Sequence, residues 1–232
     1  MKQNINVINN MGKEVNVTIN ESENGVQIVI DRPQKKICLA DLKQYTHFFD
    51  SDGEEYIVCD QFITGIAAVL KADILENNMK FGQNNNWAES EIREYLNNEY
   101  LKELERKFGE ENIVEHKVDL LSMDGFNDYG CTMDKVAIRT FDEYRKHSMG
   151  ISLVKSEWLA TPTQTPSRNC SGSDYVEYVD SDGFVDWDWC GGCGGVRPFF
   201  FLESSIFVSL EKCWIWINTT GIATLYRHCG IK

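Results

Sequence analysis

The feature that most limits the fold of this chain is a pair of short alternating runs at residues 175–179 and 184–189. Between them stands the turn Asp180-Ser181-Asp182-Gly183, whose glycine tolerates the positive φ that closing a tight turn requires. Two alternating runs bounded by such a turn are typical of an antiparallel β-hairpin. The pattern therefore predicts that this part of the chain contributes two paired strands to a sheet.

A different kind of strand is expected after the hairpin. A glycine-rich crossing occupies residues 191–195, and residues 196–202 then form a run that is almost wholly apolar. A run without alternation is typical of a strand that is covered on both faces. We therefore expect residues 196–202 to form an interior strand with a neighbour on each side.

Apolar residues that recur every four positions predict a long helix over residues 87–108. The recurring residues are Ile92, Leu96, Tyr100, Leu104 and Phe108. Asn86 is placed to cap the start of this helix, and Gly109 is placed to end it. A second, shorter helix is predicted near residues 140–147, where basic residues stand close to the C-terminal end.

Both ends of the chain add predicted strands to this central part. Residues 1–35 contain three alternating runs, as in a β-meander, and residues 211–232 contain a terminal β-hairpin with apolar side chains on both faces. Residues 36–210 are left as the main domain, in which the Asp-Ser-Asp-Gly turn occurs again at residues 50–53. Two helices combined with mostly antiparallel strands predict an α+β fold.

The charge of the chain limits its partners. Its formal net charge is −13, so nucleic-acid phosphates would be repelled, and its sparse Lys and Arg disfavour anionic membranes. The N-terminal residues lack the apolar core of a signal peptide, and no stretch approaches the length of a membrane span. We expect a cytoplasmic protein with no direct nucleic-acid binding and no membrane partner.

The spacing Cys190-Gly191-Gly192-Cys193 would let two thiolates share a zinc ion or form a reversible disulfide. A zinc site needs two more ligands, and none of the remaining candidates stands in a second matching pair; they are Cys170, Cys213, Cys229 and His228. The aspartates of the hairpin do not match a calcium-loop template. We therefore expect reduced or loosely paired thiols, with no metal and no other cofactor.

Four motifs occur in a fixed order along the chain. They are Trp87, Ser90, Arg93, Leu96 and Asn97; residues 119–124 with Tyr129 and Gly130; residues 158–162; and the hairpin followed by Gly195-Val196-Arg197-Pro198. Over roughly residues 40–205, this order resembles an uncharacterised domain-of-unknown-function family of gut Firmicutes and their phages, which looks C-type-lectin-like. Ala160 departs from the family pattern, which usually has Arg at that position.

The resemblance implies a C-type-lectin-like fold, with antiparallel sheets flanked by two helices. It also implies a role in display or in ligand binding. It implies no established chemistry. Formylglycine-generating enzymes have a related lectin-like fold and also place two reactive cysteines before such a strand. Because their cysteines are spaced differently from Cys190 and Cys193, oxidase chemistry is disfavoured.

Alternation along residues 184–189 places Val185, Trp187 and Trp189 on one face and two aspartates on the other. Tryptophan is more often found in the core than on a ligand platform, so we expect the tryptophan face to be buried. The candidate ligand-binding residues are then Tyr175, Glu177, Asp186 and Asp188 on the hairpin, with Arg168 and Asn169 from the polar loop at residues 161–173.

No catalytic residue can be assigned, because no Ser-His-Asp order, nucleophile elbow or phosphate loop occurs. We expect a non-enzymatic binding module that presents a loop-and-strand face to a protein or glycan ligand. The resemblance adds a phage or mobile element as the source, which would place the protein in the host cytoplasm. Two alternatives stay open: an acidic phage-encoded inhibitor of a host defence protein, and a virion or tail component. The sequence does not fix the oligomeric state.

Overall fold

The computed structural model describes residues 16–22, 25–31, 36–75, 77–168, 172–212, 216–217 and 224–225. Its largest element is an antiparallel sheet in the order β11-β16-β6-β5-β4-β17-β3, and β8 also pairs with β16. The bounds in that order are Val136–Ala137, Phe199–Glu203, Ile66–Lys71, Glu55–Gln61, His47–Phe49, Phe207–Ser209 and Lys36–Cys38, with Ile113–Val114 for β8. Two helices accompany mostly antiparallel sheets, which confirms the predicted α+β class.

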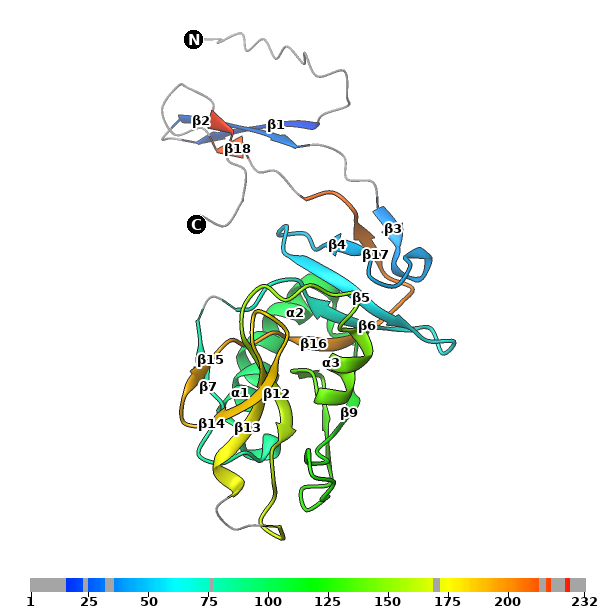
Figure 1. Ribbon diagram of the computed structural model, residues 1–232. Coiled ribbons are helices and arrows are strands. Elements are labelled where there is room, and N and C mark those ends of the chain that lie inside the picture. Colours follow the sequence, from blue (N-terminus) through cyan, green and yellow to red (C-terminus); the bar gives the residue numbers. More distant parts are fainter. Residues whose placement is uncertain are drawn as a thin grey trace.

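Strand β16 lies in the interior of the large sheet, as its apolar sequence predicts (Figure 1). It pairs with β6 on one side and with β11 and β8 on the other. Phe200 packs into the main core on one face of the sheet, whereas Phe199 packs into a second cluster. The strand begins at Phe199 rather than at Val196, because Pro198 has no N–H to donate to a ladder.

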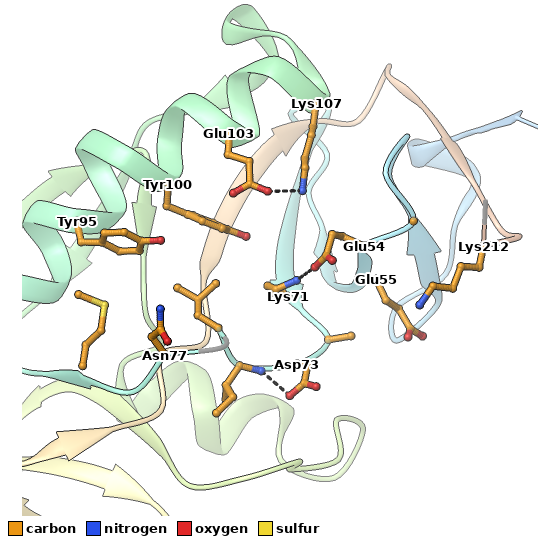
Figure 2. A pocket seen from close by; sticks show the side chains of 15 residues that line it. Glu54, Glu55, Lys71, Asp73, Asn77, Tyr95, Tyr100, Glu103, Lys107 and Lys212 are labelled. Atoms are coloured by element: carbon orange, nitrogen blue, oxygen red, sulfur yellow. Dashed lines mark hydrogen bonds and ion pairs between the residues drawn. The ribbon is translucent and has the colours of Figure 1, made fainter. Parts of the chain in front are cut away.

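The long helix is present where the sequence predicts it, as three segments that continue one another. They are α1 (Glu91–Tyr95), the π-helical turn η3 (Leu96–Tyr100) and α2 (Leu101–Phe108). The helix packs on the large sheet, and the ring centroids of Phe108 and Phe200 are 6.1 Å apart. Part of it instead faces a cavity beside β5 and β6, where Glu103 and Lys107 are seen (Figure 2).

The start of this helix differs from the prediction. Asn86 caps only a short 3₁₀ turn, η2 (Trp87–Glu89), where its side chain accepts a hydrogen bond from Ala88 N. Ser90 caps the helix itself, because its hydroxyl accepts a hydrogen bond from Arg93 N at 3.0 Å. Gly109, with a φ of 88°, ends the helix as predicted.

The second predicted helix is α3 (Phe141–His147), which begins with a capping box between Thr140 and Glu143. It packs on a three-stranded antiparallel sheet of β12 (Glu157–Pro162), β13 (Tyr175–Val179) and β14 (Val185–Trp189). The predicted hairpin is therefore confirmed as β13 and β14. In this sheet β14 is an edge strand among the residues that the structure describes.

The two Asp-Ser-Asp-Gly turns have the same geometry. Asp180 Oδ1 accepts hydrogen bonds from the N–H groups of residues 182 and 184, at 2.9 and 3.0 Å. Asp50 Oδ1 does the same for residues 52 and 54, at 2.9 Å each. Gly53 and Gly183 have φ values of 81° and 91°, which explains the glycine at the end of both turns.

Short elements complete the main domain. β9 (His116–Asp119) pairs with β10 (Cys131–Asp134), and β7 (Met79–Lys80) pairs with β15 (Cys193–Gly194). The remaining 3₁₀ turns are η1 (Leu39–Asp41), η4 (Glu110–Asn112) and η5 (Gly172–Asp174). No helix in the described ranges is long and apolar enough to cross a membrane.

Strands from the two ends of the chain lie together (Figure 1). β1 (Asn16–Ser22) pairs with β2 (Gly25–Asp31), as two strands of the predicted meander, and β18 (Trp216–Ile217) pairs with β19 (Thr224–Leu225) as the predicted terminal hairpin. β18 lies beside β2. The third predicted meander strand, near residues 5–7, and the side chains of the terminal hairpin lie outside the described residues.

Candidate functional site

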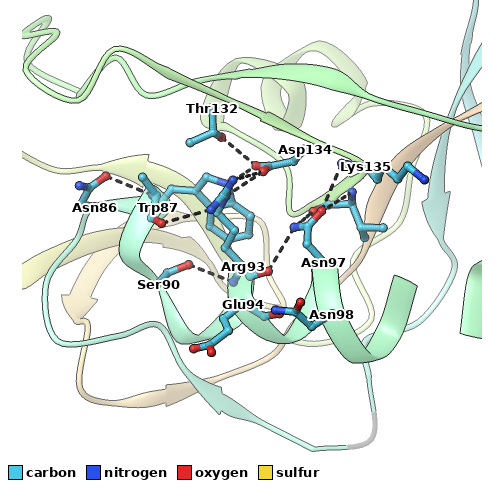
Figure 3. A network of polar contacts seen from close by, with 12 residues as sticks. Asn86, Trp87, Ser90, Arg93, Glu94, Asn97, Asn98, Thr132, Asp134 and Lys135 are labelled. Carbon is cyan, nitrogen blue, oxygen red and sulfur yellow. Dashed lines mark hydrogen bonds and ion pairs between the residues drawn. The ribbon is translucent and has the colours of Figure 1, made fainter. Parts of the chain in front are cut away.

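The motif that begins at Trp87 has a structural role (Figure 3). Its buried partner is Asp134, whose carboxylate accepts hydrogen bonds from Trp87 Nε1 at 2.8 Å and from Arg93 Nε at 2.7 Å. Thr132 Oγ1 donates a third hydrogen bond, at 2.7 Å. This carboxylate therefore fixes the start of the long helix to strand β10.

Asn97 makes the second attachment between the same helix and the sheet (Figure 3). Its Nδ2 donates to Val136 O at 2.8 Å, and its Oδ1 accepts from the N–H groups of Lys135 and Val136 at 3.2 Å. With Ser90 as the helix cap and Leu96 in the core, every polar position of this motif has a structural partner. The motif builds the scaffold, so the candidate ligand site lies elsewhere.

A second scaffold element is a cluster of buried charges formed by Arg139, Glu157 and Arg197. The Glu157 carboxylate pairs with Arg139 Nη2 and accepts from Arg197 Nη1 at 3.3 Å. Arg197 also donates to the carbonyl oxygens of Lys71 and Ala72, at 2.9 and 2.7 Å. The arginine of the predicted apolar run thus ties that segment to β6 and its C-terminal extension.

The hairpin register shows that the predicted ligand residues do not share one face. Tyr175 is paired with Trp189, and Glu177 is paired with Trp187, so these four side chains belong to one face of the sheet. Asp186 and Asp188 belong to the other face, opposite Tyr178 and Val176. The structure brings Tyr175 and Glu177 together and separates them from the two aspartates.

The expectation that the hairpin tryptophans are buried is wrong. Trp187 is 54% exposed and Trp189 is 58% exposed. They lie on an edge strand, and the apolar cluster under α3 contains Leu159 and Val179 from the same three-stranded sheet instead.

 
Among the described residues, the tryptophans of the main core are Trp87 and Trp158.

The expectation that Glu177 is exposed is also wrong, because its residue is only 4% exposed. Glu177 lies on the central strand of the three-stranded sheet and is flanked by β12 and β14. Burial raises the pKa of its carboxyl above the usual value of 4.5, and the nearby charge of Asp186 acts in the same direction.

Asp186 and Asp188 are exposed as predicted, and both are engaged locally. Asp186 Oδ1 accepts a hydrogen bond from Trp187 N at 2.9 Å, and Asp188 Oδ1 accepts one from Trp189 N at 2.7 Å. These side chains satisfy backbone N–H groups of an edge strand, which discourages pairing with a further strand. A partner that adds a strand to β14 is therefore disfavoured.

The predicted loop contributes less to this face than expected. Arg168 Nε lies 3.7 Å from Asp124 Oδ2, and Arg168 Cζ lies 5.8 Å from the ring centroid of Phe126. Arg168 therefore contacts the loop between β9 and β10 rather than the hairpin. Asn169 lies outside the described residues. Thr161 and Thr165 are buried, so the loop is only partly a surface segment.

The glycine-rich crossing lets large rings lie against the backbone. A Cβ atom at Gly191 would lie 2.6 Å from the Trp189 ring, and one at Gly194 would lie 2.6 Å from the Trp158 ring. Cys190 is buried, with Sγ 3.0 Å from Asp174 O, and Cys193 is exposed; both are free thiols. Within the described ranges, no group of three or more His, Cys, Asp or Glu residues could hold a metal ion.

The resulting candidate site is an aromatic face formed by Tyr175, Trp187 and Trp189. The rings of Tyr175 and Trp187 meet edge to face, with their centroids 4.8 Å apart. Five acidic residues stand on the same hairpin without an ion-pair partner among the described residues; they are Glu177, Asp180, Asp182, Asp186 and Asp188. Glu177 is buried, and Asp186 and Asp188 lie on the opposite face of β14, so the exposed acids border the aromatic face without being part of it.

The raised pKa of Glu177 predicts a pH-dependent change in stability. The folded protein binds the Glu177 proton more tightly than the unfolded chain does. The stability that this proton contributes is therefore full below the unfolded pKa and is lost as pH rises through the folded pKa. A Glu177→Gln variant should therefore have a higher thermal midpoint than the parent at about pH 7, and the gain should shrink toward about pH 4. Thermal unfolding followed by circular dichroism measures the midpoints of the parent and the variant at the two pH values. Asp182→Asn, in the exposed turn, is the control, and an equal gain at both pH values would contradict the prediction.

Comparisons of the chain with protein-family models, with curated proteins and with solved structures gave no match.

Proposed function

We propose that this protein is a non-enzymatic binding module that recognises a basic segment of a partner protein through its aromatic face. The observation that carries the proposal is the exposure of Trp187 and Trp189 on an edge hairpin whose acids have no described ion-pair partner. Exposed aromatic clusters mark interaction surfaces, and tryptophan and tyrosine are common anchors of binding energy.

The chemistry of the aromatic face favours arginine or lysine in the partner. A guanidinium or ammonium group can lie over an indole ring, and the nearby carboxylates attract the same positive charge. The net charge of −13 would also speed the approach of a basic partner. A partner with a helix or loop fits better than an added strand, because Asp186 and Asp188 engage edge N–H groups of β14.

We also propose that the main domain is C-type-lectin-like and comes from a phage or mobile element. Two helices flanking antiparallel sheets and the glycine-rich crossing before β16 support the fold assignment. The resemblance to the family of gut Firmicutes and their phages supports the source. On this proposal the partner is a host protein in the cytoplasm, and inhibition of a defence factor is one use of such binding.

The test uses hexa-arginine as a probe, with hexa-glutamate as the opposite-charge comparison, and isothermal titration calorimetry as the measurement. We expect hexa-arginine to bind the parent, and a variant with both Trp187→Ala and Trp189→Ala to bind about thirtyfold more weakly. This variant keeps every charge, so the loss would report the rings rather than the acidity. Phe207→Ala, which removes an exposed ring on β17, is the matched control and should bind like the parent.

Two outcomes would overturn the proposal. The first is equal affinity of the double variant and the parent for hexa-arginine, since general charge attraction would then explain all of the binding. The second is binding of a neutral oligosaccharide such as cellohexaose, lost in the double variant, while hexa-arginine binding persists. That pattern would assign the aromatic face to a glycan.

A further inference from the structure

The three rings of the aromatic face are held by their surroundings. The rings of Tyr175 and Trp187 meet at 77°, with centroids 4.8 Å apart, so they form a corner with two aromatic walls. The Trp189 ring lies over the backbone at Gly191, where a Cβ atom would be 2.6 Å from the ring. The backbone oxygen of Tyr175 accepts a hydrogen bond from Asn85 Nδ2 at 2.7 Å, which anchors the start of β13. The rings are therefore in place before a partner binds.

The aromatic face presents rings rather than carboxylates to a partner. Asp186 and Asp188 lie on the opposite face of β14, where each accepts a hydrogen bond from the next backbone N–H. Glu177 belongs to the aromatic face by its register, but only 4% of the residue is exposed. Because a tryptophan side chain has no acceptor, the Tyr175 hydroxyl is the one side-chain acceptor that the three rings supply.

This shortage of acceptors distinguishes among cations. A lysine ammonium group has three N–H donors and an arginine guanidinium has five. Both can lie over an indole ring, but each donor that leaves water without gaining an acceptor costs free energy. A quaternary ammonium group has no N–H, so it can move from water onto the rings and leave no donor unsatisfied. Its positive charge is attracted to ring faces, and groups of aromatic rings are a common means of recognising it.

The charge beneath the rings also favours a cation. Glu177 is directly opposite Trp187 and two residues from Tyr175 on the same sheet face, so its carboxyl lies beneath these two rings. It forms no ion pair with any described residue, and its polar neighbours are Thr163 and Asp186. A buried carboxylate without a cation is unfavourable, and a positive charge on the rings would offset that cost.

We propose that the aromatic face binds the trimethylammonium group of a trimethylated lysine in the partner protein. This inference rests on the proposed function and specifies which side chain of the basic segment is recognised. The trimethylammonium group lies against Tyr175, Trp187 and Trp189, and the carboxylate of Glu177 beneath the rings stabilises its charge. A segment with the same net charge but without the methyl groups binds less tightly.

The test uses three peptides that differ only in the central residue of acetyl-Ala-Ala-X-Ala-Ala-amide. X is trimethyllysine, lysine, or a neutral analogue of trimethyllysine in which carbon replaces the quaternary nitrogen. Isothermal titration calorimetry with the full chain measures the three affinities. We expect the trimethyllysine peptide to bind with a dissociation constant of about 0.5 mM or below, and each of the other two to bind at least about tenfold more weakly.

The peptides separate the contributions to binding. Lysine and trimethyllysine carry the same charge, so the attraction of the net charge of −13 is the same for both. The neutral analogue keeps the shape and apolar surface of trimethyllysine, so its loss reports the charge on the rings.

Two variants locate the site. Trp187→Phe keeps an apolar ring but weakens the attraction to a cation, so it should bind the trimethyllysine peptide about fivefold more weakly and the neutral analogue as the parent does. Because Trp187 is exposed on an edge strand, the thermal midpoint should stay near that of the parent. Phe207→Ala, which removes an exposed ring on β17, is the control and should bind all three peptides like the parent.

The proposal is overturned if the lysine peptide or the neutral analogue binds as tightly as the trimethyllysine peptide, or if Trp187→Phe binds the trimethyllysine peptide like the parent. It is also overturned if none of the three peptides binds at about 5 mM. In each of these cases the proposed function still stands if hexa-arginine binds and the double tryptophan variant loses that binding. If hexa-arginine binding does not depend on the rings, the proposed function fails as well.

Discussion

The Glu157→Gln variant is expected to lose about 3 kcal/mol of unfolding free energy, because it leaves two buried arginines without a counter-charge. Arg139 and Arg197 are 1% and 2% exposed, and Glu157 is the one described carboxylate that pairs with either of them. Glutamine keeps the shape of the side chain, so the loss reports the charge rather than a cavity. Urea unfolding followed by tryptophan fluorescence measures it.

The two arginines should contribute unequally to this loss. Arg197 keeps its hydrogen bonds to the backbone oxygens of Lys71 and Ala72, whereas Arg139 loses its described carboxylate partner. Nε and Nη1 of Arg139 already lack a hydrogen-bond partner among the described residues. Adding Arg139→Met to the Glu157→Gln variant should therefore restore most of the stability. A Glu157→Gln loss below about 1 kcal/mol, or no recovery in the double variant, would contradict this account.

The hairpin and both helices could be predicted because their signals are local. The turn that ends in Gly183 and the repeat of four along the long helix each lie within one element. The role of Arg93 could not be predicted in this way, because its partner Asp134 lies on another strand. A short motif can therefore identify a helix while leaving open whether its polar residues bind a ligand or the scaffold.

The buried face of the hairpin could not be predicted for a related reason. Alternation with a period of two separates Trp187 from Asp186, but it does not show which face the rest of the fold covers. The apolar cluster under α3 contains Val179, and the same sheet face is open at Trp187 and Trp189. The average tendency of tryptophan to be buried gave the wrong answer here, because position in the sheet decided the exposure.

The cavity had no signal in the sequence, because separate segments supply its walls. Glu54 comes from a turn, Lys71 from an apolar strand, and Tyr100 and Lys107 from a helix whose apolar repeat was the dominant feature. Tyr100 itself counted as one of the core positions of that helix. Its side chain does pack in the core, and the residue also lines the cavity.

The Asp134→Ala variant is expected to lose about 3 kcal/mol of unfolding free energy, because one buried carboxylate holds the start of the long helix on β10. Truncation would leave Trp87 Nε1, Thr132 Oγ1 and the Arg93 guanidinium without their shared acceptor. Asp119→Ala is the matched control, since Asp119 lies on the paired strand β9 and its contact with Lys117 is exposed. Denaturant unfolding should show a much lower midpoint for Asp134→Ala and a midpoint near the parent for Asp119→Ala. Equal midpoints for the two variants would show that this network does not anchor the helix.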